Sequence, residues 1–443
     1  MALVLNTGAG DAENPGLVSS STFVLSAEVR MPQTYAPTSW DEVQSVVDGM
    51  LDDEILDLSG LTQFPDNNPA SVVTKTITIS EDITITAQMD PVLGKFGDGT
   101  DYVPFHNVNF VLADNPTVTF RHVELNFSTN LNSLISGEGN VIVDESQIIQ
   151  AGSPFSAIYV DGDVTVRGTI AKLRNGNLNF TSFVGASGID IDGRNPAASI
   201  RAHNVTIDGG SVAGCSTTGS EAKGGIGIEA FGNVTITGGF VIIDGVPTDK
   251  AHISGGDGFG EGGNGGDAIV VMGDLTVTGG CFITGGRGAG AEDYFPSVTT
   301  GGTGGSAIVA SGNVTLSGER TTDANETSSM RVISGKGGYC TGVAIRFTPD
   351  AESPRTLTAK TAYIRQAAYS AFGRNNNLGG YSNFYTIEQQ ADDQSILDDC
   401  LVGWYNDLPI FSGGWYKITN PFRTYGTNAN ATALEGSEWA HTP

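Results

Sequence analysis

The chain has 443 residues, of which 61 are glycine and 17 proline, and 39% are hydrophobic. Glycine at this level without a Gly-X-Y period excludes collagen, and the hydrophobic share excludes a plain disordered tract. The 49 acidic and 22 basic residues give a formal net charge of −27, which argues against nucleic acid and anionic membranes as partners and favours divalent cations such as calcium.

Residues 1–36 show no clear period and are interpreted as an N-terminal arm or cap. A helix is predicted near residues 39–50, because Ser39 and Glu42 have the spacing of a capping box. Its apolar face is formed by Val43, Val46, Val47 and Met50. A short strand is predicted over 54–60. A helix in this place would cover the first coil of a repeated structure, whose open strand edges need protection.

From about residue 74 the apolar residues alternate with polar ones, as in Ile77 and Ile79 and again in Val141 and Val143. This period of two predicts short strands with one buried face. Helical periods are absent between the strands, which excludes a doubly wound α/β fold.

A three-part phrase recurs between residues 152 and 360. The first part combines a small residue with an apolar pair, in SAIYVDGD, GIGIEAFGN, DAIVVMGD and SAIVASGN. The second part follows at once and begins at Val164, Val234, Leu275 and Val314, with a similar phrase at Asn204. The third part is Ile-Ser/Thr-Gly at Ile253, Ile283 and Ile333. The later copies repeat about every 40 residues, a period typical of stacked units.

Glycine, asparagine and aspartate follow the strands of each repeat, where tight corners favour residues that tolerate a positive φ. Three short strands with such corners describe a three-sided coil that closes through a glycine-rich loop. We therefore predict an all-β fold, a right-handed parallel β-helix with glycine-rich loops over residues 37–375. Val164, Val234, Leu275 and Val314 are predicted to stack in one ladder.

Residues 376–443 are predicted to form a C-terminal aromatic-rich cap or a small β module. Two aromatic doublets occur there, Trp404-Tyr405 and Trp415-Tyr416. Exposed Trp and Tyr rings stack on sugars or on partner side chains, so these four residues are the predicted binding surface. The alternative is that the rings pack against the last coil.

Paired carboxylates suggest polysaccharide hydrolysis, which needs two such groups across a sugar. The candidates are Asp161 with Asp163 and Asp190 with Asp192, which share one face of an extended strand at i, i+2. The alternative is that they are corner and solvent-facing residues. The signature tripeptides of pectin hydrolases, Asn-Thr-Asp, Gly-His-Gly and Arg-Ile-Lys, are absent from the sequence.

The glycine-rich loops carry three acidic residues that are candidates for binding calcium, Asp257, Glu261 and Asp267. Their spacing does not match the calcium-binding nonapeptide GGxGxDxUx. The five histidines and four cysteines are scattered without HxH, HExxH or CxxC spacing, which argues against a zinc site. No other cofactor is predicted.

The stretch SWDEVQSVVDGMLDDEILDLSG, the ITI and VTF strands and the GNVTITGG repeats resemble secreted parallel β-helix adhesin-like proteins of bacteria and archaea. Phage tailspikes and fibres use the same architecture. The resemblance covers roughly residues 38–360 and implies the fold and a surface location, but no individual functional residue.

The predicted function is that of a non-catalytic surface adhesin or structural scaffold that displays loops to a glycan or protein partner. The expected location is extracellular, at a cell surface or on a virion. One alternative is a phage or viral appendage, which would form a homo-oligomer, a trimer in the fibre case. The other is a polysaccharide lyase or glycoside hydrolase. No membrane insertion is predicted, since no apolar run reaches 18 residues.

Overall fold

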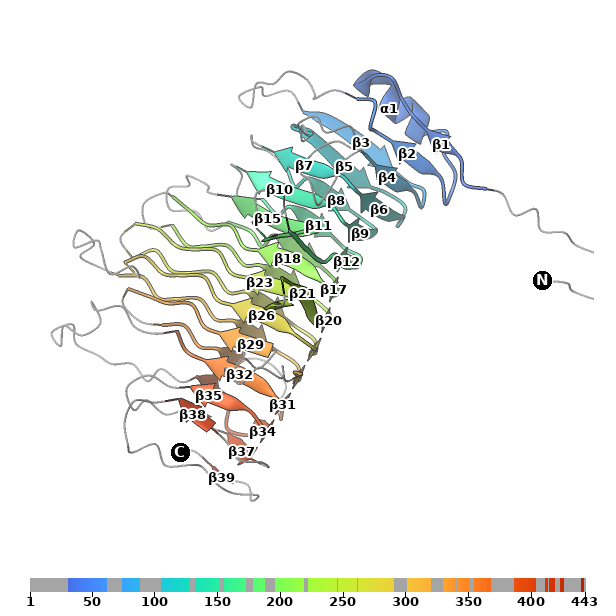
Figure 1. The fold of residues 1–443 in the computed structure, drawn as a ribbon. Helices are drawn as coiled ribbons and strands as arrows, with labels where there is room; N and C mark the ends of the chain where they lie inside the picture. Colours follow the sequence, from blue (N-terminus) through green and yellow to red (C-terminus); the bar gives the residue numbers. More distant parts are fainter. Residues whose placement is uncertain are drawn as a thin grey trace, which may run out of the picture.

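In the computed structural model the chain winds into successive coils, and from β5 onward each coil adds one strand to each of three long sheets (Figure 1). The structure describes residues 31–61, 74–87, 105–127, 132–151, 155–172, 178–187, 196–218, 222–244, 246–260, 262–290, 301–319, 330–338, 341–349, 354–367, 386–403, 411–412, 414–418, 423–425 and 440–441.

Sheet 1 receives the first strand of each coil, sheet 2 the second and sheet 3 the third. Sheet 1 consists of β3 (Lys75–Ile79), β5 (Val108–Leu112), β8 (Ile135–Gly137), β11 (Ile158–Val160), β16 (Ile200–Ala202), β19 (Ile228–Ala230), β24 (Ile269–Val271), β27 (Ile308–Ala310), β30 (Ile345–Phe347), β33 (Ile387–Glu388) and β36 (Phe411–Ser412). Sheet 2 consists of β1 (Thr34–Tyr35), β2 (Ile55–Asp57), β4 (Thr84–Thr86), β6 (Thr117–Arg121), β9 (Asn140–Asp144), β12 (Val164–Arg167), β17 (Val205–Asp208), β20 (Val234–Thr237), β25 (Leu275–Thr278), β28 (Val314–Ser317), β31 (Thr356–Lys360), β34 (Gln394–Asp398), β37 (Trp415–Ile418) and β39 (Ala440–His441). Sheet 3 consists of β7 (Glu124–Phe127), β10 (Gln147–Ala151), β15 (Phe183–Ser187), β18 (Gly210–Ala213), β23 (Ala251–Ser254), β26 (Cys281–Thr284), β29 (Met330–Ile333), β32 (Ala362–Arg365), β35 (Leu401–Gly403) and β38 (Arg423–Tyr425).

Neighbouring strands of these sheets run parallel, apart from β39, which pairs antiparallel with β37. Two antiparallel hairpins interrupt the path from sheet 2 to sheet 3. They are β13 (Ile170–Lys172) with β14 (Leu178–Phe180) and β21 (Phe240–Ile243) with β22 (Val246–Asp249). The prediction of an all-β solenoid of parallel strands is therefore confirmed.

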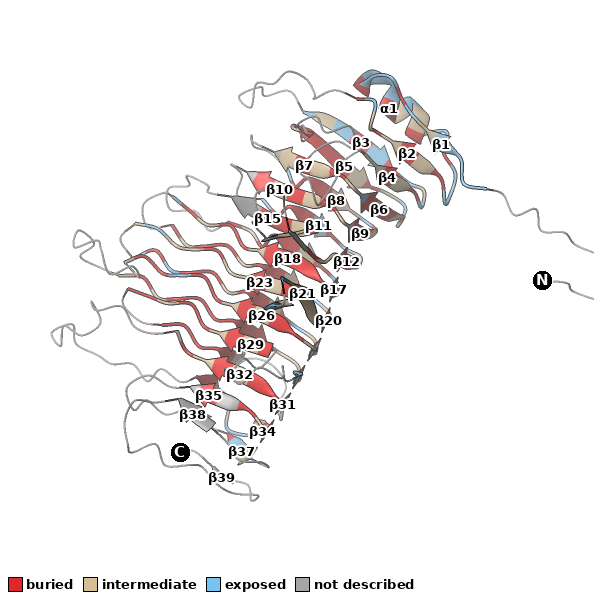
Figure 2. Cartoon of the chain, viewed as in Figure 1, coloured by how far each residue is buried: buried red, intermediate tan, exposed pale blue. Residues whose placement is uncertain are grey.

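The core lies between the three sheets and is filled by ladders of apolar side chains (Figure 2). In sheet 2 the paired positions Val164, Val205, Val234, Leu275 and Val314 follow one another from coil to coil, and all are buried. The predicted single ladder is confirmed. Alternation explains it, because β-branched residues at every second position can line the inner face of each strand.

The third part of the repeat is shifted by one residue in the last of its three copies. Ile253 pairs with Ile283, as predicted, but Ile283 pairs with Val332 and not with Ile333. Met330 and Val332 are the buried residues of β29, so Ile333 falls on the outer face. A one-residue slip reverses the face of every side chain, and the buried alternation therefore decides the register.

Helix α1 (Trp40–Val47) lies where it was predicted, at the N-terminal end of the stack beside the first strands (Figure 1). Trp40, Val43 and Val47 are buried, and the Trp40 ring packs edge-on against Phe105 at 5.1 Å between centroids. The capping box is wrong in detail, because Ser39 makes no side-chain cap hydrogen bond. Instead the Glu42 carboxylate accepts hydrogen bonds from the backbone and hydroxyl of Thr38, which lowers its pKa.

The glycine-rich segments between sheet 3 and sheet 1 form a hydrogen-bonded stack of their own, which runs beside the strands in Figure 1. We call it the glycine stack; its members, in order, are Cys215, Gly225, Gly256, Gly266, Gly286, Gly305, Gly335 and Gly342. Each residue donates its N–H to the carbonyl oxygen of the one before it, at 2.7–3.0 Å. The segments that leave sheet 3 and those that enter sheet 1 therefore alternate in one continuous column.

Strands on both sides of the predicted boundaries belong to the same three sheets. β1 lies within residues 1–36 and pairs with β2. β33, β34 and β35 lie within residues 376–443 and pair with β30, β31 and β32 of the preceding coil.

Candidate functional site

Asparagine and aspartate side chains form a ladder along the corner between sheet 1 and sheet 2. We call it the corner ladder; its members are Asn140, Asp163, Asn204, Asn233, Asp274 and Asn313. The Oδ1 atom of each residue accepts the backbone N–H of the next member at 2.7–3.1 Å, and Asn313 accepts that of Thr356. The ladder thus satisfies backbone donors that the sheets leave unpaired at the turn.

Replacing Asn233 by alanine is expected to lower the free energy of unfolding by about 1 kcal/mol, because the N–H of Asp274 loses its acceptor at an exposed corner. Asn233→Asp keeps an acceptor oxygen and should cost less. Denaturant midpoints of the two variants check this, and an equal loss in both would show that the acceptor does not matter.

Of the four candidate catalytic carboxylates, the structure describes Asp161 and Asp163. Asp163 belongs to the corner ladder, and its Oδ1 accepts both the backbone N–H and the side-chain amide of Asn204. Asp161 lies at the end of β11, at an exposed position of the sheet 1 face. Asp190 and Asp192 lie outside the described residues.

The two described candidates for calcium binding, Asp257 and Asp267, are engaged with neighbouring groups. The Asp257 carboxylate accepts hydrogen bonds from the backbone N–H of Arg287 at 2.7 Å and from its guanidinium at 2.8 and 2.9 Å. Asp267 accepts the backbone N–H of Ser306 at 2.6 Å, and Glu261 lies outside the described residues. Among the described residues, no group of three or more His, Cys, Asp and Glu side chains has an arrangement that could hold a metal ion.

The predicted aromatic surface is described only for its second doublet. Trp415 is 41% exposed, whereas Tyr416 is partly buried and packs against the core. The two rings therefore lie on opposite sides of β37, as neighbours on a strand must. Trp404 and Tyr405 lie outside the described residues.

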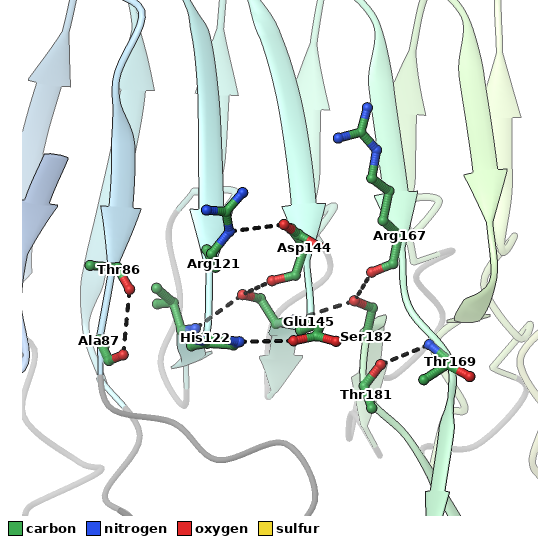
Figure 3. Close-up of polar contacts among 12 residues, drawn as sticks. Thr86, Ala87, Arg121, His122, Asp144, Glu145, Arg167, Thr169, Thr181 and Ser182 are labelled. Atoms are coloured by element: carbon green, nitrogen blue, oxygen red, sulfur yellow. Dashed lines mark hydrogen bonds and ion pairs between the residues drawn. The ribbon is translucent and has the colours of Figure 1, made fainter. Parts of the chain in front are cut away.

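Charged pairs cross from coil to coil at the corner between sheet 2 and sheet 3 (Figure 3). Arg121 Nε lies 2.9 Å from Asp144 Oδ2, and His122 Nε2 lies 2.8 Å from Glu145 Oε2. His122 and Glu145 both have positive φ, at 54° and 46°, so the two corners have the same left-handed turn. Below them Ser146 and Ser182 are buried and bond to backbone groups of adjacent coils. These ion pairs therefore connect neighbouring coils to one another.

Glu124 lies on the outer face of sheet 3, where burial raises the pKa of its carboxyl to about 7. In the register of the strands it is followed by Gln147, Phe183, Ser211 and His252. Four coil steps of about 4.8 Å therefore separate it from His252, roughly 19 Å. Glu124 and His252 are too far apart to act on one bond.

The raised pKa of Glu124 predicts that the protein loses stability as pH rises. The folded chain holds this proton more tightly than the unfolded chain, whose carboxyl titrates near 4.5. The stabilisation that the bound proton contributes is therefore fully present below pH 4.5 and is lost as the pH rises through 7. Between pH 5 and pH 8, the wild-type free energy of unfolding should fall by on the order of 2 kcal/mol relative to Glu124→Gln. Urea unfolding at both pH values measures this, and the exposed Glu138→Gln variant is the control. Parallel behaviour of wild type and Glu124→Gln would contradict the prediction.

Side chains on the outer face of sheet 3 link it to the β21–β22 hairpin through an ion pair of Arg331. His252 stacks on Phe282 at 4.9 Å between centroids, and the Arg331 guanidinium lies 4.5 Å from the centre of the same ring. Arg331 also pairs with Asp249 of the hairpin. Burial, with a further contribution from Arg331, lowers the pKa of His252 to about 4, so its imidazole is neutral near pH 7. These contacts indicate a structural role in packing.

An exposed surface on sheet 1 combines aromatic, apolar and charged side chains over four consecutive coils. We call it the sheet 1 platform; its members are Tyr159, Asp161, Arg201, His203, Glu229, Phe231 and Met272. Six of them occupy the outward middle position of β11, β16 and β19 and the outward position two residues later, and Met272 occupies this second position in the coil of β24. These positions lie on one face of a sheet. Tyr159, Phe231 and Met272 are 43%, 38% and 51% exposed.

Arg201 is the centre of the sheet 1 platform. Its guanidinium carbon lies 5.3 Å from the ring centre of Tyr159 and 5.1 Å from that of Phe231, within the range of cation–π attraction. Arg201 Nε lies 3.3 Å from Glu229 Oε2, but the geometry is not that of a hydrogen bond, and this buried Nε has no hydrogen-bond partner. The guanidinium therefore lies within reach of both rings.

The sheet 1 platform was not among the sites predicted from the sequence. A signal for it exists in the first part of the repeat, where the residue after the aligned isoleucine points outward. Reading that position and the one two residues later would have picked out Tyr159 with Asp161, and Glu229 with Phe231.

The three described cysteines, Cys215, Cys281 and Cys400, are buried. Burial raises the pKa of the Cys400 thiol to about 11 and also raises that of Cys281, so both thiols stay protonated near neutral pH. Cys340 lies outside the described residues.

No helix in the described part of the chain has the length and apolar character needed to cross a membrane. The chain matches no protein-family model, no curated protein and no solved structure.

Proposed function

We propose that this protein is a non-catalytic binding protein that works outside the cell, at a cell surface or on a virion, as a rigid support for a ligand-binding face. The observation that carries the proposal is a contrast between two sets of side chains, one of which binds the backbone of neighbouring coils while the other remains exposed. Asp163 and the rest of the corner ladder bind backbone of the next coil, whereas Tyr159, Phe231 and Met272 stay exposed on one flat face.

Rigidity follows from the architecture. Each coil is joined to the next by the hydrogen bonds of three sheets, by the corner ladder and, over part of the chain, by the glycine stack. We infer that the coils wind right-handed, as nearly all parallel crossover connections do, and that α1 covers the apolar end of the first coil. Such a frame keeps outward side chains at fixed spacings and favours recognition of an extended ligand.

The geometry gives the hydrolase alternative little support. Glu124 and Asp249 are the two largely buried carboxyl groups with a raised pKa among the described residues. Asp249 is paired with Arg331, and Glu124 lies several coils away from this pair. A retaining or inverting mechanism needs two carboxyl groups within about 10 Å across one sugar.

A binding screen that also records chemistry tests the proposal. The full chain is incubated with arrayed glycans and with intact bacterial cells, with and without calcium, and released reducing and unsaturated sugars are measured. Retention on a surface without sugar release is the expected result. Release of sugar fragments would overturn the proposal. The absence of binding to any of the surfaces tested would also overturn it.

A further inference from the structure

We propose that the sheet 1 platform binds a neutral, extended oligosaccharide along the axis of the coils. This inference rests on the proposed function and assigns it a site and a ligand class. The platform lies on sheet 1, whereas Trp415 and Tyr416, the described pair of the suggested aromatic surface, lie on β37 of sheet 2. It is built from the outward middle residues of β11, β16 and β19, together with the residues that directly follow β11, β16, β19 and β24.

The size of the platform fits a short glycan. From β11 to β24 there are three coil steps, about 14 Å along the axis, and the two outward positions of one strand are about 7 Å apart. This area is far below the roughly 800 Å² per partner that a stable protein interface buries. A sugar ring and a coil advance by similar distances, so successive rings can meet equivalent positions.

The chemistry of the platform suits a sugar. Tyr159 and Phe231 are partly exposed aromatic residues, and aromatic faces pack against the apolar C–H faces of a pyranose ring. Between them Arg201 has only donors and Glu229 only acceptors when ionised, and their side chains are 38% and 23% exposed. A sugar hydroxyl can accept from the first and donate to the second, and Asp161 and His203 add polar groups at the edge of the platform.

Charge selects neutral sugars over acidic ones. The chain carries a formal charge of −27, and on the platform Glu229 offsets the charge of Arg201 at 3.3 Å. A polyanionic glycan would approach against the field of the whole protein and would find no uncompensated cation in Arg201. Neither effect weakens the binding of a neutral glycan.

The test measures binding of the full chain to a panel of neutral oligosaccharides of three to six sugars, namely cello-, xylo-, manno-, malto- and galacto-oligosaccharides, together with oligogalacturonate. Wild type should bind at least one neutral member. Phe231→Ala and Arg201→Ala should each weaken that binding at least tenfold, whereas Phe231→Tyr should retain it because a ring remains.

Two controls keep the outcome interpretable. Thr278→Ala changes an exposed side chain on sheet 2 and should leave affinity unchanged, and Trp415→Ala tests the C-terminal coils. Unchanged binding by folded Phe231→Ala and Arg201→Ala, or a loss confined to Trp415→Ala, would overturn the platform but leave the proposed function standing. Preference for oligogalacturonate, or binding to cells but to no neutral sugar, would overturn the ligand class. Failure to bind cells and glycans alike would overturn the proposed function itself.

Discussion

Alanine in place of Gly286 is expected to lower the free energy of unfolding by about 3 kcal/mol or more, since added atoms in a packed interior force the backbone apart. A Cβ at this position would lie 1.9 Å from the carbonyl oxygen of Gly256 and 2.6 Å from its carbon. Gly286 also donates to Gly266 and accepts from Gly305 within the glycine stack. The backbone has to separate, and hydrogen bonds on both sides are strained together.

Gly60→Ala is the matched control. No atom lies within 4 Å of a Cβ built at Gly60, and its φ is not positive, so the change should cost little. Chemical denaturation gives the two losses, and hydrogen exchange of the amides of Gly266 and Gly305 shows whether the stack opens locally. Similar denaturation midpoints for the two variants would contradict close backbone packing in the stack.

Asp393→Ala is expected to cost about 4 kcal/mol, because it leaves the charge of Arg355 buried without its partner. The two side chains are 0% and 3% exposed. Arg355 donates to Asp393 from its backbone N–H, its Nε and its Nη2, at 3.0, 3.0 and 2.8 Å. Asp393 also accepts the backbone N–H of Gln390 at 2.8 Å, so one carboxylate links two segments of chain.

Exposure separates this ion pair from the one at the sheet 2–sheet 3 corner. Arg121 is 50% exposed and pairs with Asp144 at 2.9 Å, so Arg121→Ala should cost less than about 1 kcal/mol. The double variant Arg355→Met/Asp393→Leu removes both buried charges and should recover much of the loss caused by Asp393→Ala. Urea unfolding of the four proteins measures these differences. A cost for Asp393→Ala no larger than that for Arg121→Ala would show that water reaches the buried pair.

The alternation of apolar and polar residues was sufficient to predict the strands and their inward faces. Val164, Val234, Leu275 and Val314 occupy one ladder because every second residue of a strand faces the core. The same rule, applied to Met330 and Val332, would have placed Ile333 outside. Matching Ile333 to Ile283 by the following glycine gave the wrong register, since loop glycines do not determine which face is buried.

Contacts between coils were beyond prediction, because the coils differ in length. Arg355 and Asp393 are 38 residues apart, whereas neighbours in the corner ladder are separated by as few as 23 or as many as 41. No constant spacing identifies such partners in a sequence. The glycine-rich segments were predicted to be independent loops for the same reason. The segments that leave sheet 3 and those that enter sheet 1 alternate only after the coils are stacked.

The repeated strand positions of successive coils make the protein extensible in whole units. Ser306 occupies the place in its coil that Asp267 occupies in the one before, as their shared backbone contacts show. Gain or loss of one such unit during evolution would rejoin equivalent positions and leave every remaining ladder in step. Each unit changes the span of the molecule by about 4.8 Å. Reach can therefore be adjusted by duplication or deletion, separately from the side chains that determine what is recognised.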